Sequence, residues 1–374
     1  MQCLVAAVRP LQVKELAEVL AVNFDAEGIP KLNSNLRWED QEGAVMLACS
    51  SLVTIVKDGD SRIVQFSHFS VKEFLTADRL AEPMRDVSRY YIRLKAAHTI
   101  LAQACLGVLL GLDDHVDRDN IKDFPLARYS AENWARHAQF EGVSALIKDE
   151  MACLFDEDKP HFAAWLWIHD RMSTMRPKEP GVVPLYHAAR FGFRDLAAHL
   201  LAEHPEHVNA RGGPHDTAIV AAAAEGNADI ISLLLEHDAD VNSRNIHGST
   251  SLTWASSHGT LRGGQCLLDH GADVNSQDYY GFTPLSGATF AGHVEFVQML
   301  LERGAVIDTR DIDGKTSLHK AVERGRIEVA RLLLERGADV NARDNAGNTP
   351  SQYAIATQQD ILELLSEYGA GSVK

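Results

Sequence analysis

The side chains of this sequence that could do chemistry are acidic clusters, one histidine pair and one glycine-lysine-threonine triplet. These candidates are Asp113 with Asp114, Asp156 with Glu157 and Asp158, His204 with His207, Asp308 with Asp311 and Asp313, and Gly314 with Lys315 and Thr316. Paired carboxylates can transfer protons, two histidines can begin a zinc site, spaced aspartates can begin a calcium loop, and the triplet can end a phosphate-binding loop.

Each of these chemistries needs further residues at a fixed spacing, and here they are missing. The phosphate loop requires a glycine where Thr309 stands, and the calcium loop requires a glutamate where His319 stands. The histidine pair has no third ligand nearby in the sequence, and the paired carboxylates fall in turn-like stretches. We therefore expect no catalytic residue, no metal ion and no cofactor, and the chain is expected not to be an enzyme.

The composition is that of a soluble globular protein with an acidic surface. The 374 residues are 45% hydrophobic and 24% charged, with a formal net charge of −16. A negative field repels phosphate backbones, so nucleic acid is not an expected partner. The longest apolar stretch, 100–112, is too short to cross a membrane, and five cysteines without C-x-x-C spacing indicate a reducing compartment, the cytoplasm.

A period of 33 residues runs through the second half of the chain. Three classes of position recur with it: Gly248, Gly281, Gly314 and Gly347; Asn209, Asn242, Asn275, Asp308 and Asn341; and Thr217, Thr250, Thr283, Thr316 and Thr349. The segments TSLHKAVERGR and LLERGADVNARD represent one unit. This pattern resembles the ankyrin repeat, in which two short helices and a projecting turn, or finger, form each unit.

The residue types explain why such units stack. Recurring alanines such as Ala288 allow close helix packing, and leucine pairs such as Leu300 with Leu301 supply a buried face. Glycines such as Gly304 end the second helix, and D-x-x-G segments form the fingers. We predict a mainly α solenoid over 183–374 with about six units, the first degenerate and the last a cap. Only the fifth unit keeps the histidine of the motif, His319, so some polar contacts between units are expected to differ from those of the family.

The first half of the chain predicts two further domains. Helical spacing at 11–22 and 39–52, a hairpin around Asp58 to Asp60, and a helix from Ser70 indicate a winged-helix-like domain over 1–82. The S-x-x-E pair Ser70 and Glu73 reads as a capping box. Residues 83–176 predict a connector of three or four helices with tryptophans in its core, and the proline-rich segment 177–184 predicts the domain boundary.

The segments RWEDQEGAVMLACSSLVTIV and VQFSHFSVKEFLTADRL also resemble a known family, the fungal NACHT-type, NOD-like-receptor-related ankyrin proteins. That resemblance implies that His68 approaches bound ADP, provided that a nucleotide-binding domain is present. The alternative for His68 is a half-buried histidine at a strand end, beside Phe66 and Phe69. Because a phosphate loop is missing, the resemblance implies a truncated gene model or a natural fragment, and the chain alone is expected not to bind nucleotides.

The repeat favours a protein-protein interaction module or scaffold as the function. The alternative is a fragment of a NACHT-type nucleotide-regulated ATPase or GTPase receptor. Binding of DNA by the winged helix is disfavoured, because residues 1–80 carry more acidic than basic side chains.

Aligning the units places six residues on the predicted partner-binding surface. These are Tyr279 and Tyr280 at a finger tip and Trp254, Phe290, Lys320 and Glu323 on groove-facing helix positions. The alternative is structural: the tyrosines cap a turn and Trp254 fills a void left by Gly263 and Gly264 in the third unit. These glycines predict a packing deficit, faster hydrogen exchange around 259–270, and a stabilising effect of Gly264→Ala.

Overall fold

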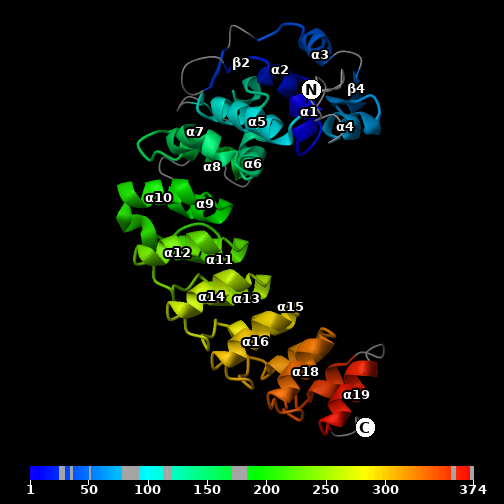
Figure 1. The fold of residues 1–374 in the computed structure, drawn as a ribbon, viewed down its shortest axis with the longest axis vertical. Coiled ribbons are helices and arrows are strands. Elements are labelled where there is room, and N and C mark those ends of the chain that lie inside the picture. Colours follow the sequence, from blue (N-terminus) through cyan, green and yellow to red (C-terminus); the bar gives the residue numbers. More distant parts are fainter. Residues whose placement is uncertain are drawn as a thin grey trace. The chain divides into compact units, whose positions relative to one another are not determined.

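The computed structural model describes residues 1–24, 30–33, 37–49, 52–77, 92–112, 116, 120–170, 183–354 and 359–370. The chain forms two compact units, residues 1–184 and 185–374 (Figure 1). Most of the predicted boundary 177–184 lies outside the described residues. Within the described part, no helix is both long and apolar enough to cross a membrane.

The N-terminal part of the first unit has the predicted winged-helix arrangement with two small sheets. Its elements are α1 (Gln2–Ala6), β1 (Leu11–Gln12), α2 (Val13–Val19), β2 (Val22–Asn23), β3 (Lys31–Leu32), α3 (Gln41–Cys49), β4 (Val53–Asp58), β5 (Ser61–Phe66) and α4 (Phe69–Thr76). The antiparallel strands lie in the order β1-β5-β4, and β2 pairs with β3. The ends of the predicted helix 11–22 are strands, because Leu11 pairs with Val64 and Val22 pairs with Leu32.

The β4–β5 hairpin forms where the sequence predicts it, but the helix that follows is capped differently. Gly59 has a φ of 57°, the left-handed conformation that a two-residue hairpin loop requires. Helix α4 begins at Phe69, and its N-cap is His68, whose Nδ1 accepts a hydrogen bond from the backbone N–H of Ser70 at 3.3 Å. Ser70 therefore lies in the first helical turn, and the predicted capping box is wrong.

The predicted helical connector consists of four α-helices and two short 3-10 helices in the described residues. These are α5 (Leu94–Leu109), η5 (Ile121–Asp123), α6 (Ala127–Ala138), η6 (Ser144–Leu146), α7 (Lys148–Leu154) and α8 (His161–His169). The tryptophans lie in the core as expected: Trp134 and Trp165 are buried, with ring centroids 5.7 Å apart and nearly perpendicular. Their rings anchor α6 to α8, because edge-on aromatic pairs stabilise beyond the area they bury.

A polar chain within the first unit connects α5, α6 and the residues after α1. The backbone N–H of Val8 donates to Tyr129 Oη at 3.2 Å, Tyr129 Oη lies 2.9 Å from His137 Nε2, and His137 Nδ1 lies 2.9 Å from His98 Nδ1. Burial lowers the pKa of His137 to about 4. His137 is therefore neutral near pH 7 and works as a hydrogen-bonding core residue.

The five cysteines are all free thiols. Cys3, Cys49 and Cys105 are buried, and Cys153 and Cys266 are partly exposed. Burial raises the pKa of Cys105 to about 12, so this thiol is protonated and unreactive near neutral pH.

In its described residues, the second unit is a stack of six helix pairs, as the repeat predicts (Figure 1). The pairs are α9 (Pro184–Phe191) with α10 (Arg194–Glu203), followed by η7 (Pro205–Asn209); α11 (Ala218–Glu225) with α12 (Ala228–Glu236); α13 (Ser251–His258) with α14 (Leu261–Asp269); α15 (Pro284–Ala291) with α16 (Val294–Glu302); α17 (Ser317–Glu323) with α18 (Ile327–Glu335); and η8 (Pro350–Tyr353) with α19 (Gln359–Glu367). The first helices contact one another along the stack from α11 onward, and the second helices do so from α10 onward.

Amide side chains connect successive pairs. Asn275 Oδ1 accepts from the backbone N–H of Val306 at 2.8 Å, and its Nδ2 donates to the carbonyl of Gly304 at 3.2 Å. Asn242 and Asn209 make the same two bonds one and two units earlier. Asp308 stands at this position in the fourth unit, where it accepts from Asp339 N at 3.2 Å but has no side-chain N–H to donate.

The predicted packing deficit at Gly263 and Gly264 is wrong. Both glycines are buried in α14, and a Cβ on Gly264 would lie 2.2 Å from Phe296 Cζ. Phe296 of the next unit is itself buried, so its ring occupies the space that a side chain at 264 would need. Glycine allows the close helix approach here, so the geometry argues against the predicted stabilisation by Gly264→Ala.

Candidate protein-binding surface

Four finger turns of the second unit share one polar design. In each, a side-chain oxygen accepts from the backbone N–H groups two and four residues later, and the four residues are Asn245, Asp278, Asp311 and Asp344. The glycine that closes each turn has a left-handed φ, for example 76° at Gly281. The side-chain oxygen and the glycine together hold the turn, which leaves the residues between them free to vary.

Neighbouring fingers are bonded to each other through the backbone. Tyr279 N donates to the His247 carbonyl at 3.0 Å, Ile312 N to the Tyr280 carbonyl at 3.0 Å, and Asn345 N to the Asp313 carbonyl at 2.9 Å. We call the residues 244–248, 277–281, 310–314 and 343–347 the finger strip. Because each finger is bonded to the next, the strip presents its side chains in a fixed order.

Both predicted finger-tip tyrosines are exposed, and they belong to a longer apolar row. Tyr279 is 71% exposed and Tyr280 is 52% exposed. Ile246 and Ile312 occupy the same turn position as Tyr279 in the fingers before and after it, and they are 69% and 61% exposed. Neither isoleucine is among the predicted partner-binding residues, although their spacing of 33 residues from Tyr279 marks them as equivalent to it.

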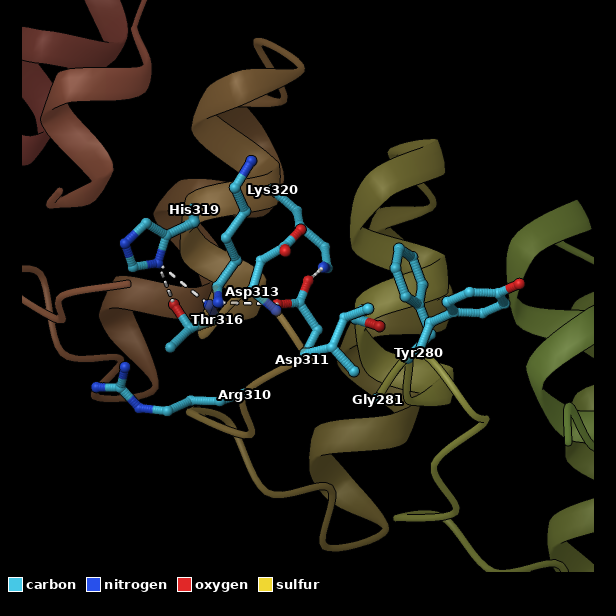
Figure 2. A network of polar contacts seen from close by, with 12 residues as sticks. Tyr280, Gly281, Arg310, Asp311, Asp313, Thr316, His319 and Lys320 are labelled. Carbon is cyan, nitrogen blue, oxygen red and sulfur yellow. Dashed lines mark hydrogen bonds and ion pairs between the residues drawn. The ribbon is translucent and has the colours of Figure 1, made fainter. Parts of the chain in front are cut away.

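Lys320 does not belong to the surface on which it was predicted. Its side chain is 4% exposed and pairs with the carboxylate of Asp311, which is 5% exposed (Figure 2). The ammonium also lies 4.1 Å from the centre of the Phe282 ring. Lys320 is therefore an internal support of the finger, because its charge neutralises the buried turn carboxylate.

Phe290 of the fourth unit and Glu323 of the fifth unit, also predicted to face the groove, each contact a neighbouring basic side chain. The guanidinium of Arg324 lies 3.9 Å from the centre of the partly exposed Phe290 ring, a cation–π contact. Glu323 is exposed and accepts from Lys315 Nζ at 3.2 Å. Phe290 and Glu323 can contact a partner. Their existing contacts with Arg324 and Lys315 would have to be replaced, which lowers the binding free energy that they can contribute.

Trp254 is mostly enclosed by histidines. Its ring lies 4.7 Å from that of His215, edge to face, and 5.6 Å from that of His258, nearly parallel. Since Phe296 occupies the space beside Gly264, the alternative that Trp254 fills a void there is wrong. Trp254 Nε1 and His215 Nδ1 are buried and have no hydrogen-bond partner among the described residues.

The motif histidine of the fifth unit joins two units. His319 Nδ1 accepts from the backbone N–H of Thr316 at 3.2 Å (Figure 2). Nε2 therefore carries the proton and donates to the carbonyl of Asn348 at 3.2 Å. Burial lowers the pKa of His319, which favours this neutral form. Ser286 and Gln352 replace the histidine within their own units, since each completes a capping box.

The remaining candidate residues lie as follows in the structure. His68 is exposed, so the alternative of a half-buried histidine is wrong. Gly314 is a finger glycine with a φ of 77°, and Lys315 Nζ lies 4.2 Å from the centre of the Tyr353 ring, so the triplet is part of the repeat as expected. Asp156 pairs with Lys159 Nζ at 2.6 Å, and His204 stacks on His207. Asp113 and Asp114 lie outside the described residues.

Comparison with known proteins assigns the repeat. The family model for ankyrin repeats matches residues 102–245, 185–278, 245–311, 265–344 and 307–373. The chain belongs to the ankyrin-repeat family. Residues 1–84 match the winged helix domain of GPI inositol-deacylase. Ankyrin repeats are typical protein-binding modules, so the finger strip lies on a fold suited to that task.

One curated relative is the azaphilone pigments biosynthesis cluster protein L of Monascus ruber. It is 32% identical over 248 residues, which cover 60% of this chain and 51% of that protein. The ankyrin chain thus spans about half the length of this relative.

Proposed function

We propose that this ankyrin chain is a non-enzymatic scaffold that binds a protein partner through the finger strip. The observation that carries the proposal is the row of Ile246, Tyr279 and Ile312, which share one turn position in consecutive fingers and are each more than 60% exposed. The finger fold does not need large apolar side chains there, because the turn oxygen and the glycine hold the turn. Contiguous exposed apolar side chains mark interaction sites, and tyrosine is enriched among binding hot spots.

The strip is also preorganised for binding. The backbone bonds from Tyr279, Ile312 and Asn345 to the preceding fingers are made within the chain, before any partner arrives. A partner therefore does not have to order these turns, which removes one of the costs of association.

The same residues support the absence of catalysis. The turn carboxylates of Asp278, Asp311 and Asp344 are occupied by backbone amides and by Ser249, Lys320 and Tyr353. Carboxylates engaged in this way support the finger turns rather than a reaction. Five free thiols support a reducing compartment such as the cytoplasm.

The test compares two double variants in capture of partners from lysate of the source organism. Tyr279→Ser with Ile312→Ser removes two strip residues, whereas Val306→Ser with Tyr368→Ser removes one aliphatic and one tyrosine side chain outside the strip. We expect the strip variant to lose a partner that wild type retains, with an affinity at least roughly tenfold lower, and the control to keep it. Equal capture by both variants, with unchanged melting temperatures, contradicts the proposal.

A second candidate is a fragment of a NACHT-type nucleotide-regulated receptor, favoured by the exposed ring of His68 at the start of α4. Titration calorimetry with ADP distinguishes the two candidates. The scaffold proposal expects no binding by this chain. Micromolar binding that His68→Ala abolishes supports the second candidate.

A further inference from the structure

The finger strip presents a row of exposed arginines on an acidic chain. Arg244, Arg310 and Arg343 are exposed and occupy the position before the turn oxygen in three of the four fingers. The turn acids Asp311 and Asp344 are turned inward, with Asp311 paired to Lys320 and Asp344 only 8% exposed. On a chain of net charge −16, the strip thus shows three exposed arginines, one exposed aspartate, Asp313, and the half-buried Asp278.

Each arginine is held by one nitrogen only. Arg244 Nη1 donates to the carbonyls of Gly248 at 2.9 Å and Gln277 at 2.6 Å. Arg310 Nη1 repeats this with Gly314 at 3.1 Å and with the Arg343 carbonyl, and Arg343 Nη1 donates to Gly347 at 2.8 Å. Among the described residues, Nε and Nη2 of these arginines have no hydrogen-bond partner. The Nε–Nη2 edge is the one that grips a carboxylate with two parallel bonds.

In two fingers the arginine and the exposed apolar residue lie two positions apart, Arg244 with Ile246 and Arg310 with Ile312. The strip therefore shows a cationic row beside an apolar row. We infer that the partner is an acidic protein segment in which carboxylates accompany apolar side chains. This inference rests on the proposed function and specifies the chemistry of its partner. A polyphosphate is disfavoured by the negative field of the chain and by the apolar row.

Gln277 supplies the design of the test, because it is the natural uncharged member of the arginine row. Its Nε2 donates to the carbonyls of Gly281 and Arg310, both at 3.2 Å, which repeats the two bonds that Arg244 makes. Substituting the three arginines by glutamine is thus expected to keep the side-chain hydrogen bonds to the finger carbonyls while removing the positive charge. Arg262→Gln with Arg331→Gln is the control, since both arginines are exposed on second helices, α14 and α18.

The experiment measures fluorescence anisotropy of a labelled peptide of alternating leucine and glutamate with the full chain. Matched peptides carry lysine for glutamate, or serine for leucine. The chain's net charge alone favours the lysine peptide, whereas the strip favours the glutamate peptide. We expect the leucine–glutamate peptide to bind most tightly. We expect the triple glutamine variant to bind it roughly tenfold more weakly, Gln277→Arg to bind it severalfold more tightly, and the control to match wild type.

Tighter binding of the lysine peptide, absence of binding by the glutamate peptide, or equal loss in the control overturns the inference. The result also separates it from the proposed function. If Tyr279→Ser with Ile312→Ser weakens peptide binding but the glutamine variant does not, the apolar row binds proteins without a preference for acid. If the strip and the control variants all bind the peptide as wild type does, both proposals fail.

Discussion

Asp308→Asn is expected to stabilise the repeat stack, because it restores a bond that neighbouring units make. The asparagines at this position donate from Nδ2 to a carbonyl 29 residues later at 3.1–3.4 Å, for example Asn242 to Gly271 and Asn275 to Gly304. The corresponding acceptor for residue 308 is the Gly337 carbonyl. An aspartate cannot donate to it, so the junction between the fourth and fifth units lacks this bond.

The expected gain follows from two contributions of the same sign. One added hydrogen bond contributes about 0.5–1.5 kcal/mol. In addition, burial and the nearby Asp339 raise the pKa of Asp308, so the folded state disfavours the charge that this carboxylate carries at pH 7. This cost disappears as the pH falls below the unfolded pKa, since the carboxylate is then neutral in both states. We expect a gain of about 1 kcal/mol or more at pH 7, a rise in melting temperature of about 2–4 °C, and a smaller gain near pH 3.

Urea denaturation at pH 7 and pH 3 measures this gain, and hydrogen exchange at the Asp339 amide locates it. Asn275→Asp is the matched control, because it introduces the same defect one unit earlier and should destabilise by a similar amount. If Asp308→Asn is neutral or destabilising while Asn275→Asp destabilises, the junction is built around a carboxylate and the reasoning is refuted.

Three further substitutions test the interiors of the two units. Gly264→Ala should destabilise by about 1–3 kcal/mol in urea denaturation, because its methyl group would collide with the Phe296 ring. Lys320→Met should destabilise by about 3–5 kcal/mol, because it leaves the buried Asp311 carboxylate without its cation, and a thermal melt measures the loss. His137→Gln should make the free energy of unfolding depend less on pH between about pH 6.5 and pH 4. In wild type the unfolded histidine takes up a proton below about pH 6.5, whereas the folded histidine does so only near pH 4. Wild type therefore loses about 3 kcal/mol of stability over that range.

Each of these has a contrasting variant or outcome. Gly263→Ala should be nearly neutral, because its Cβ would meet the movable Cδ1 of Ile231 at 3.0 Å and Thr260 Oγ1 at an ordinary 3.7 Å. A loss equal to that of Gly264→Ala would contradict the packing argument. Asp311→Asn with Lys320→Met should be more stable than Lys320→Met alone, and the opposite order would rule out a stranded charge. Parallel pH profiles for wild type and His137→Gln would mean that His137 is protonated in the fold.

The sequence predicted the repeat architecture well because its signals are local. Left-handed glycines, turn acids and threonine caps act within a few residues of each other, so a 33-residue period carries them directly into helices and fingers. The winged helix was predicted for the same reason, through its hairpin. Errors arose where a local signal competed with a neighbour, as when His68 rather than Ser70 capped α4.

The candidate site could be predicted only in part, because exposure depends on contacts across the sequence. Lys320 was placed on the surface by alignment of the units, but Asp311, nine residues earlier, turns inward and draws the lysine with it. The sequence predicts a packing void beside Gly264, but Phe296, 32 residues later, fills that space. Tyr279 was found as a conspicuous residue, whereas Ile246 and Ile312 required comparison of the same turn position in different units.

The repeat separates the residues that hold the fold from those that are free to serve a partner. The turn oxygen and the glycine recur in every finger of the strip because the turn fails without them, so they carry no information about a partner. The residue after the turn oxygen is unconstrained by the turn, and in the last finger it is the polar Asn345. Since nothing in the turn requires Ile246, Tyr279 and Ile312 to be large and apolar, their shared character at consecutive fingers calls for a cause outside the fold, and a bound protein segment supplies one.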